Sequence, residues 1–391
     1  MFIRPTLLGD CIEKFGDFME KIKILFLINT LGGGGAERVL VNLVNNMDLQ
    51  KYEITVETMF SGGVNETLLK PEIHYICKNA FTMKGISHIY KFLPARYLYK
   101  KFIGNNHYDI IVGYMHNVPV KAISGCDDKL TKLIGWCHCG TVRKDTYCTC
   151  WFTKKGAEKS YKICDALAGV SDTVSNGVKD FFNITTPCVT VYNTNDVNMI
   201  HKMSEKPFEL DNNVINICAV GRLSFEKGND RLISAANRLL DEGYKINLYL
   251  LGAGKERENL QKLVQDNNNE KSIKFLGFRE NPYPAIKNTD LFVCPSRVEG
   301  LSTVVIEALL LGKPIVSTDV SGAKEILGYN NDYGCVVENS TNGIYNGIKL
   351  FLDNENLFNY YGKKAKERSS FFEISQTVKQ AENLFESVLS Q

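Results

Sequence analysis

The chain has 391 residues, of which 44% are hydrophobic and 23% are charged, and its formal net charge at pH 7 is +2. This composition is typical of folded globular proteins and excludes a disordered or fibrous chain. No apolar run reaches the roughly 18 residues that a membrane span needs, so the sequence does not predict an integral membrane protein. The length fits two domains of about 150 to 200 residues each.

The first 20 residues lack the long apolar core and the small-residue cleavage site of a secretory signal. We therefore expect a cytoplasmic protein in which residues 1–20 are an extension outside the fold. The twelve cysteines are then expected to be reduced thiols rather than a disulfide framework.

Short apolar runs alternate with helical or loop segments through the first half of the chain. Strands are predicted at residues 22–28, 54–59, 110–114, 133–136 and 166–170. The first of them is followed by four glycines, at 32–35, and then by an amphipathic helical pattern over residues 36–44. This alternation predicts a parallel sheet covered by helices.

The same alternation restarts after a polar segment, residues 201–213, which carries Pro207 and no strong periodicity. Strands are predicted at residues 215–220, 246–251, 273–276, 291–294 and 314–317, with helices at 229–242 and 255–267. We therefore expect an N-terminal domain over residues 21–205 and a C-terminal domain over residues 206–365. Residues 366–391 are predicted to form a helix that packs back on the N-terminal domain. The fold class is α/β, with two Rossmann-like domains.

A turn with two cations follows the first strand of the second half. Gly221 and Gly228 allow a close turn, and Arg222 and Lys227 lie between them. Open parallel sheets bind ligands beyond the carboxyl ends of their strands, so these cations are placed where a diphosphate could bind. A solvated turn with two ordinary surface cations is the alternative.

The strand at 291–294 is followed by a loop that holds Glu299 and by a helix that we expect to begin near Ser302. The free amides at the start of a helix favour an anion there. Glu307 lies in the second turn of this helix among apolar residues. Because an unpaired buried carboxylate is costly, we expect Glu307 to face a polar cleft or the solvent side of the helix.

On these residues the sequence resembles the retaining glycosyltransferases of the GT-B fold, family 4, from Gly32 to about Leu327. The resemblance is carried by the pair Glu299 and Glu307, by the run at 221–228 and by the run at 312–322. It implies two Rossmann-like domains that face each other across a cleft. It also implies that Arg222 and Lys227 neutralise the donor diphosphate, that Glu299 contacts the donor sugar, that Glu307 holds the ribose hydroxyls, and that the amides of Leu301 and Ser302 complete the phosphate site.

The resemblance assigns residues of the first half as well. The loop with Gly34 and Gly35 is similar to the family's glycine loop near the transferred sugar and phosphates, although a glycine run also serves a tight turn. His138, at the end of the strand 133–136, is the expected histidine beside the donor sugar. His116 occupies a similar strand-end position and is the second choice. A structural histidine is the alternative for both.

The expected chemistry needs no cofactor and no metal, because cations and helix amides at the diphosphate supply the electrostatic help. The sequence also contains no Asp-x-Asp pair that would bind a divalent ion. One rival site is the cluster of Cys137, Cys139, Cys148 and Cys150 with His138, whose thiolates could bind zinc. Its Cys-x-Cys spacing is not the usual Cys-x2-Cys, so we do not predict a metal there.

A basic and aromatic segment in the first half indicates a surface for anionic lipid. Between Glu72 and Asp109 there is no acidic residue, and cations alternate with aromatic residues: Lys78, Lys84, Lys91, Arg96, Lys100 and Lys101 with Phe81, Tyr90, Phe92, Tyr97, Tyr99 and Phe102. Such a patch suits a membrane surface or a lipid-diphosphate acceptor. A helix with its aromatic residues in the core and its lysines in solvent is the alternative.

The function that follows is transfer of a hexose or N-acetylhexosamine from a nucleotide diphosphate sugar, expected to be a UDP-sugar, to a cell-surface glycan or lipid-linked acceptor. We expect no nucleic acid partner, and a cytoplasmic protein with peripheral contact to the inner face of the plasma membrane. A nucleotide-sugar 2-epimerase or a glycogen-type synthase on the same fold is a rival enzyme. A non-catalytic glycan- or nucleotide-binding subunit is a rival of another class, although such a scaffold has no need of Arg222, Lys227, Glu299 and Glu307 together.

Overall fold

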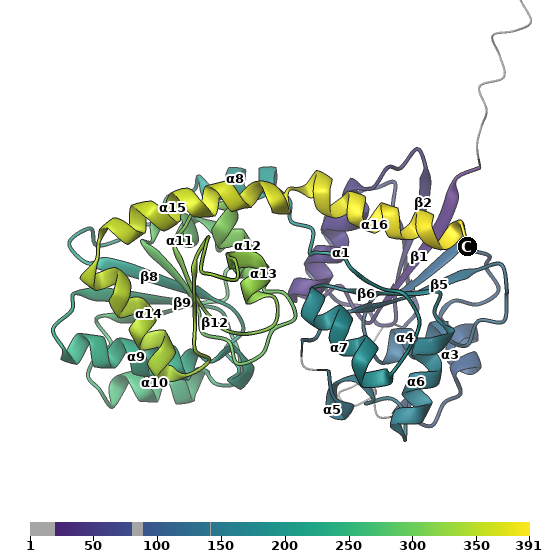
Figure 1. Cartoon of the computed structure of the whole chain (residues 1–391), viewed down its shortest axis with the longest axis horizontal. Coiled ribbons are helices and arrows are strands. Elements are labelled where there is room, and N and C mark those ends of the chain that lie inside the picture. Colours follow the sequence, from purple (N-terminus) through teal and green to yellow (C-terminus); the bar gives the residue numbers. More distant parts are fainter. Residues whose placement is uncertain (1–19, 80–88, 141) are drawn as a thin grey trace, which may run out of the picture.

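A computed structural model describes residues 20–79, 89–140 and 142–391, which form two α/β domains side by side (Figure 1). The first sheet has the order β3-β2-β1-β4-β5-β6-β7 and the second the order β10-β9-β8-β11-β12-β13. Every strand pair is parallel. The prediction of an α/β fold with two Rossmann-like domains is confirmed. The predicted extension lies almost wholly outside the described residues, which begin at Glu20.

The N-terminal domain contains the first seven strands and the helices that cover them. The strands are β1 (Ile22–Ile28), β2 (Tyr52–Thr58), β3 (His74–Cys77), β4 (Ile110–Gly113), β5 (Lys132–Cys137), β6 (Ala166–Gly169) and β7 (Cys188–Thr190). The helices are α1 (Gly35–Asn46), α3 (Ala95–Phe102), α4 (Val118–Ile123), α5 (Lys144–Tyr147), α6 (Lys154–Ile163) and α7 (Asp172–Phe182), with a 3-10 turn η1 (Glu66–Leu68).

The C-terminal domain contains the other six strands. They are β8 (Ile215–Val220), β9 (Ile246–Leu251), β10 (Ile273–Gly277), β11 (Leu291–Cys294), β12 (Ile315–Thr318) and β13 (Cys335–Val337). The helices that follow the first domain are α8 (Val197–Ser204), α9 (Asn229–Asp241), α10 (Arg257–Gln265), α11 (Tyr283–Asn288), α12 (Thr303–Leu310), α13 (Ala323–Leu327), α14 (Thr341–Asp353), α15 (Asn356–Ser369) and α16 (Ile374–Leu389), with 3-10 turns η2 (Phe225–Lys227) and η3 (Ser370–Phe372).

The central strands are mostly apolar because helices cover both faces of each sheet. Residues 24–28 of β1 and all six residues of β9 are buried. Helices α1 and α9 carry their apolar residues on one side, which packs on the sheets. The larger hydrophobic cluster extends from the first sheet into the second domain, and a smaller cluster lies within the second domain alone.

The division into domains differs from the predicted one at two places. Helix α8 contacts α11 and α12, so the chain leaves the N-terminal domain before α8 and not at residue 205. Helix α15 continues to Ser369, past the predicted boundary at 365, and the chain then crosses back through η3 (Figure 1). The expected boundary at 205 falls just after the end of α8, and the one at 365 falls inside α15, where hydrophobic periodicity gives no break.

Helix α16 lies against the N-terminal domain (Figure 1). Phe385 is fully buried and meets Phe26 and Tyr52 edge-on, with ring centroids 6.0 and 6.3 Å apart. The Lys51 ammonium pairs with Glu386. The end of the chain is thus part of the first domain's core. No helix in the described ranges is long and apolar enough to cross a bilayer.

Candidate functional site

The strand order reverses at one point in each sheet, between β1 and β4 and between β8 and β11. At such a point the loops that follow the two strands diverge and leave room for a ligand beyond their carboxyl ends. The predicted site residues follow these four strands, except His138, which follows β5, the neighbour of β4. The topology therefore explains why motifs that are far apart in the sequence come together.

The turn after β8 is shaped by close backbone contacts. A Cβ atom on Gly252 would lie 1.8 Å from the Gly221 carbonyl oxygen, and one on Gly228 would lie 2.1 Å from the Pro295 carbonyl oxygen. Gly228 also has a φ of 66°, which favours glycine. Arg222 is exposed on this turn, whereas Lys227 is half-buried. The turn is thus fixed against both the β9 loop and the β11 loop.

Lys227 and Glu299 form a direct ion pair, with Nζ 2.6 Å from Oε1. The Ser296 hydroxyl donates to the same carboxylate oxygen at 2.6 Å. Only 10% of the Glu299 side chain is exposed, so the pair is shielded from solvent. The cation predicted to bind the phosphate therefore contacts the carboxylate predicted to hold the sugar.

The loop that carries Glu299 is braced by two arginines that the sequence reasoning missed. Arg297 donates to both carboxylate oxygens of Asp230, at 2.7 and 2.6 Å, and its guanidinium lies 4.0 Å from the Phe225 ring centroid. The buried Arg231 donates to the Pro295 carbonyl at 2.5 Å. Bidentate and charge-assisted bonds of this kind fix geometry. They tie the β11 loop to η2 and α9, the elements that also position Lys227.

Helix α12 begins at Thr303 with Ser302 as its N-cap, and the Ser302 side chain makes no capping hydrogen bond. An anion would therefore find amide donors there. Glu307 accepts a hydrogen bond from the Tyr283 hydroxyl at 3.3 Å. Burial raises the pKa of Glu307 to about 7, against the opposing effects of Tyr283 and the Arg38 charge. Arg38 belongs to α1, so Glu307 faces the other domain.

The glycine loop after β1 meets the start of α12. A Cβ atom on Gly35 would lie 2.9 Å from the Thr303 hydroxyl oxygen, and one on Gly34 would lie 2.2 Å from a Glu37 carboxylate oxygen. Burial raises the pKa of Glu37, while its own backbone amide and the Arg222 charge oppose that shift. Gly34, Gly35 and Arg222 thus belong to one site that spans the domain boundary.

His138 lies beside this boundary. Its ring is 4.8 Å from the Tyr114 ring, and a Cβ atom on Gly300 would lie 2.1 Å from its carbonyl oxygen. Burial and then the neighbouring His116 lower the pKa of His138 to about 3, so the imidazole is neutral at pH 7. Nε2 is buried without a hydrogen-bond partner among the described residues, which fits a polar ligand group.

His116 lies farther from the donor-side loops and stacks on Tyr147 at 4.7 Å. Burial lowers its pKa to about 4. It packs as a core histidine would, although Nδ1 is buried with no hydrogen-bond partner in the described ranges.

The cysteines of the rival metal site are mostly packed in the core. Cys137, Cys148 and Cys150 are buried, and burial raises the pKa of each thiol. Within residues 20–79, 89–140 and 142–391, no group of three or more His, Cys, Asp or Glu side chains could hold a metal ion. The described thiols therefore behave as small apolar side chains.

The structure brings together Gly34, Gly35, Gly221, Arg222, Lys227, Glu299, Leu301, Ser302, Glu307 and, at the edge, His138. Sequence reasoning missed Glu37, Arg38 and Tyr283. The first two directly follow the glycine loop, and a charged pair at the start of an otherwise apolar helix was the available signal. Cations, helix amides and carboxylates in this arrangement can bind a diphosphate beside a hydroxyl-rich group.

Comparisons with known proteins agree with this geometry. Residues 202–368 match the family model described as "Glycosyl transferases group 1". The chain is 28% identical over 365 residues to a Campylobacter jejuni protein, covering 91% of this chain and 96% of the relative, which is named N-acetylgalactosamine-N,N'-diacetylbacillosaminyl-diphospho-undecaprenol 4-alpha-N-acetylgalactosaminyltransferase. A second Campylobacter jejuni relative, named as an alpha-1,4-N-acetyl-D-galactosaminyltransferase, is 27% identical over 90% of this chain and 95% of its own length.

The fold is also that of a solved structure. The crystal structure of HepE from Anabaena in complex with UDP matches with a TM-score of 0.74 and 20% identity, covering 94% of this chain and all of the other. The family match, the relatives and the two facing α/β domains lead to one conclusion. The chain is a glycosyltransferase, an enzyme with the GT-B fold, and its residues 202–368 match the family model of group 1 glycosyl transferases.

Proposed function

We propose that this enzyme transfers a hexose or N-acetylhexosamine from a UDP-sugar, with retention of configuration, to a lipid-linked or cell-surface glycan. The names of the Campylobacter jejuni relatives, which specify N-acetylgalactosamine transfer and undecaprenol-linked saccharides, support the sugar and acceptor classes. The HepE complex with UDP supports the nucleotide.

The observation that carries the proposal is the Lys227–Glu299 pair beside the start of α12, with Glu307 one turn further along the same helix. A diphosphate at the α12 amides would lie within reach of Lys227 and the exposed Arg222. Glu299 is then positioned for sugar hydroxyls and Glu307 for ribose hydroxyls. The three groups of a nucleotide sugar thus each have a partner of the right chemistry.

The proposed reaction needs charge stabilisation more than proton transfer. Breaking the glycosyl–phosphate bond places negative charge on the diphosphate, which Arg222, Lys227 and the α12 amides stabilise. The acceptor hydroxyl attacks from the face that the diphosphate leaves, and a phosphate oxygen takes its proton. His138 is neutral and so offers a hydrogen bond to the sugar rather than a charge. We propose no metal and no cofactor, because these protein groups supply the positive charge.

We also propose that the enzyme docks on anionic membrane through a patch made of Phe92, Phe152, Lys100, Lys101 and Lys154. Phe92 and Phe152 are 72% and 64% exposed and meet edge-on at 5.2 Å. The three lysines are exposed as well. Apolar side chains that insert and cations that meet lipid phosphates are the two components of interfacial binding.

This patch is smaller than the segment predicted from the sequence. Tyr90, Tyr99 and Phe102 are buried in the core, as the alternative interpretation expected. Phe81 and Lys84 lie outside the described residues. The exposed Phe152 follows the buried Trp151 along the chain and completes the patch.

Liposome sedimentation tests the patch. Because the inserted rings and the lysines act together, the double substitution Phe92→Ala with Phe152→Ala should reduce binding to vesicles with anionic lipid about tenfold or more. Tyr329→Ala, which removes a 70% exposed aromatic ring from the C-terminal domain, serves as the control. Equal binding to neutral and anionic vesicles would contradict the proposal.

A donor panel tests the reaction. The purified enzyme is incubated with UDP-, GDP- and ADP-linked hexoses and N-acetylhexosamines and a lipid extract, and nucleoside diphosphate release is followed. We expect turnover of a UDP-sugar and, by NMR of the product, the same anomeric configuration as in the donor. Turnover of another nucleotide alone, or inversion, would refute the corresponding part of the proposal.

A further inference from the structure

The N-terminus of α7, in the first domain, is capped by a carboxylate of the second domain. Glu325 of α13 accepts hydrogen bonds from the backbone amides of Asp172 and Thr173, at 2.8 and 3.2 Å, and from the Thr173 hydroxyl at 3.2 Å. These are the first two amides of the helix, which lack partners within it. A carboxylate is the favoured group there, because the helix dipole places positive charge at this end.

The same face of the first domain binds the loop that carries Glu299. The Ser171 hydroxyl, which precedes α7, donates to the Gly300 carbonyl at 3.1 Å. The side-chain amide of Asn193 donates to the Leu301 carbonyl at 3.0 Å. Ser321, four residues before Glu325, donates to the Gly300 carbonyl at 2.9 Å. The carbonyls of Gly300 and Leu301 therefore face the first domain.

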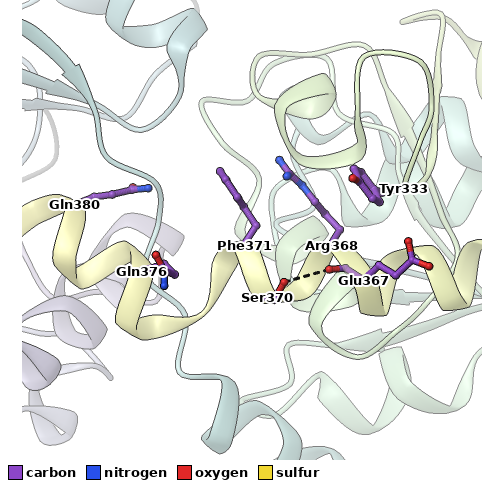
Figure 2. Close-up of a pocket in the computed structure, with 7 residues that line it drawn as sticks. All are labelled: Tyr333, Glu367, Arg368, Ser370, Phe371, Gln376 and Gln380. Atoms are coloured by element: carbon purple, nitrogen blue, oxygen red, sulfur yellow. Dashed lines mark hydrogen bonds between the residues drawn. The ribbon is translucent and has the colours of Figure 1, made fainter.

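Glu325 is itself held in place from two sides. Arg368 of α15 donates to the Glu325 carbonyl at 2.6 Å and to the Ile326 carbonyl at 3.2 Å. Arg368 lines a hollow of about 350 Å³ beside the turn between α15 and α16, next to Tyr333 and Phe371 (Figure 2). From the first domain, the Tyr192 hydroxyl donates to the Glu325 carboxylate at 3.3 Å. Glu325 is 7% exposed, so its bonds are shielded from water.

We propose that Glu325 is a positioning residue that couples the contact between the domains to the shape of the donor loop. Its bonds to α7 exist only when the domains are together, and they place Ser171 and Asn193 on the carbonyls of Gly300 and Leu301. The contact thereby orients Glu299 and the amides before α12 toward the donor. The expected change in kcat rests on the proposed function, whereas the expected change in the contact between the domains does not.

The substitution Glu325→Gln tests it, because Gln has the same size and lacks the charge. Each amide bond to the carboxylate is then weakened or lost, so the domains should separate more often. We expect a larger radius of gyration by small-angle X-ray scattering. With the donor that the panel identifies, we expect kcat to fall about tenfold while the affinity for UDP changes less than twofold. Glu325→Asp should recover part of kcat.

The matched control is Glu367→Gln, the same change at an exposed glutamate of α15 that pairs with Lys364. It should behave as wild type. The radius of gyration is measured without substrate, so it tests the contact between the domains even if the proposed function is wrong. An unchanged radius in Glu325→Gln, or a loss of UDP affinity equal to the loss of kcat, would overturn the coupling.

Asn193→Ala is a second variant that keeps the α7 cap. It removes the bond to the Leu301 carbonyl, so kcat should fall with UDP affinity retained, as in Glu325→Gln. Thermal unfolding of each variant shows that it folds. Wild-type kcat in Asn193→Ala would contradict the proposed link between the domain contact and the donor loop.

Discussion

Two buried glutamates, one in each domain, have pKa values raised to about 7 by burial. Glu307 faces Arg38 and Tyr283 at the candidate site, whereas Glu57 of β2 faces only Lys78, at 3.7 Å, among the described residues. The folded protein holds both protons more tightly than the unfolded chain does. The stability that each group contributes is therefore complete below pH 4.5 and is lost as pH rises through 7.

Glu307→Gln should remove that pH dependence at one position. Between pH 5 and pH 8 the wild type should lose about 2 kcal/mol more unfolding free energy than the variant, as urea denaturation at each pH would show. Glu57→Gln should have a similar effect on stability. Only Glu307→Gln should weaken UDP binding, by about tenfold, because we propose that Glu307 holds the ribose. Equal UDP affinity in the two variants would contradict the assignment.

At the scale of elements, the loop between β11 and α12 leaves no space for a side chain at Gly300. A Cβ atom there would lie 2.1 Å from the His138 carbonyl oxygen, which belongs to the strand end of the other domain. Backbone atoms cannot move aside as a flexible side chain can. The smallest residue is therefore required where the two domains touch.

Gly300→Ala should force the domains apart at this point. We expect the transfer rate to fall at least tenfold, since displacements of about 1 Å near reacting groups have effects of that size or larger. Gly156→Ala in α6, where the new Cβ atom would lie 3.4 Å from the Thr153 hydroxyl oxygen, should leave the rate unchanged. Initial transfer rates of the two variants and the wild type test this prediction. Wild-type activity in Gly300→Ala would rule out the tight contact between the domains.

The strands could be predicted from the sequence because the central strands of parallel sheets are continuous apolar runs. All ten predicted strands occur, and β1, β8, β9 and β11 have the predicted bounds. The three that were missed, β3, β7 and β13, have three or four residues and are the outer strands at three of the four sheet edges. Such strands are only partly buried and so lack the apolar signal.

The candidate site was only partly predictable. Arg222, Lys227, Glu299 and Glu307 follow strand ends within one domain, so local pattern and resemblance find them. The direct pairing of Lys227 with Glu299 and the approach of Arg38 to Glu307 depend on side-chain directions and on how the domains are placed. The cap by Glu325 depends on the same placement. A single sequence does not encode that placement as a pattern.

For the molecule as a whole, one hydrophobic cluster runs through the first domain and one side of the second, a second cluster fills the other side of the second domain, and the chain crosses the domain boundary twice. The crossing through η3 places α16 on the first domain (Figure 1). Glu325, Ser171 and Asn193 add direct bonds between the domains. This arrangement lets the first domain act on the donor loop of the second.

The central claim is that the second domain binds a UDP-sugar through Arg222 and its neighbours for transfer to an acceptor. The most direct test measures UDP release from the preferred donor by the wild type, by Arg222→Ala and by Arg238→Ala, a control at a surface arginine that pairs with Glu242. We predict that Arg222→Ala lowers kcat/KM about a hundredfold and that Arg238→Ala stays within about twofold of wild type. Equal activity of Arg222→Ala and wild type, or no turnover of any nucleotide sugar, would contradict the account.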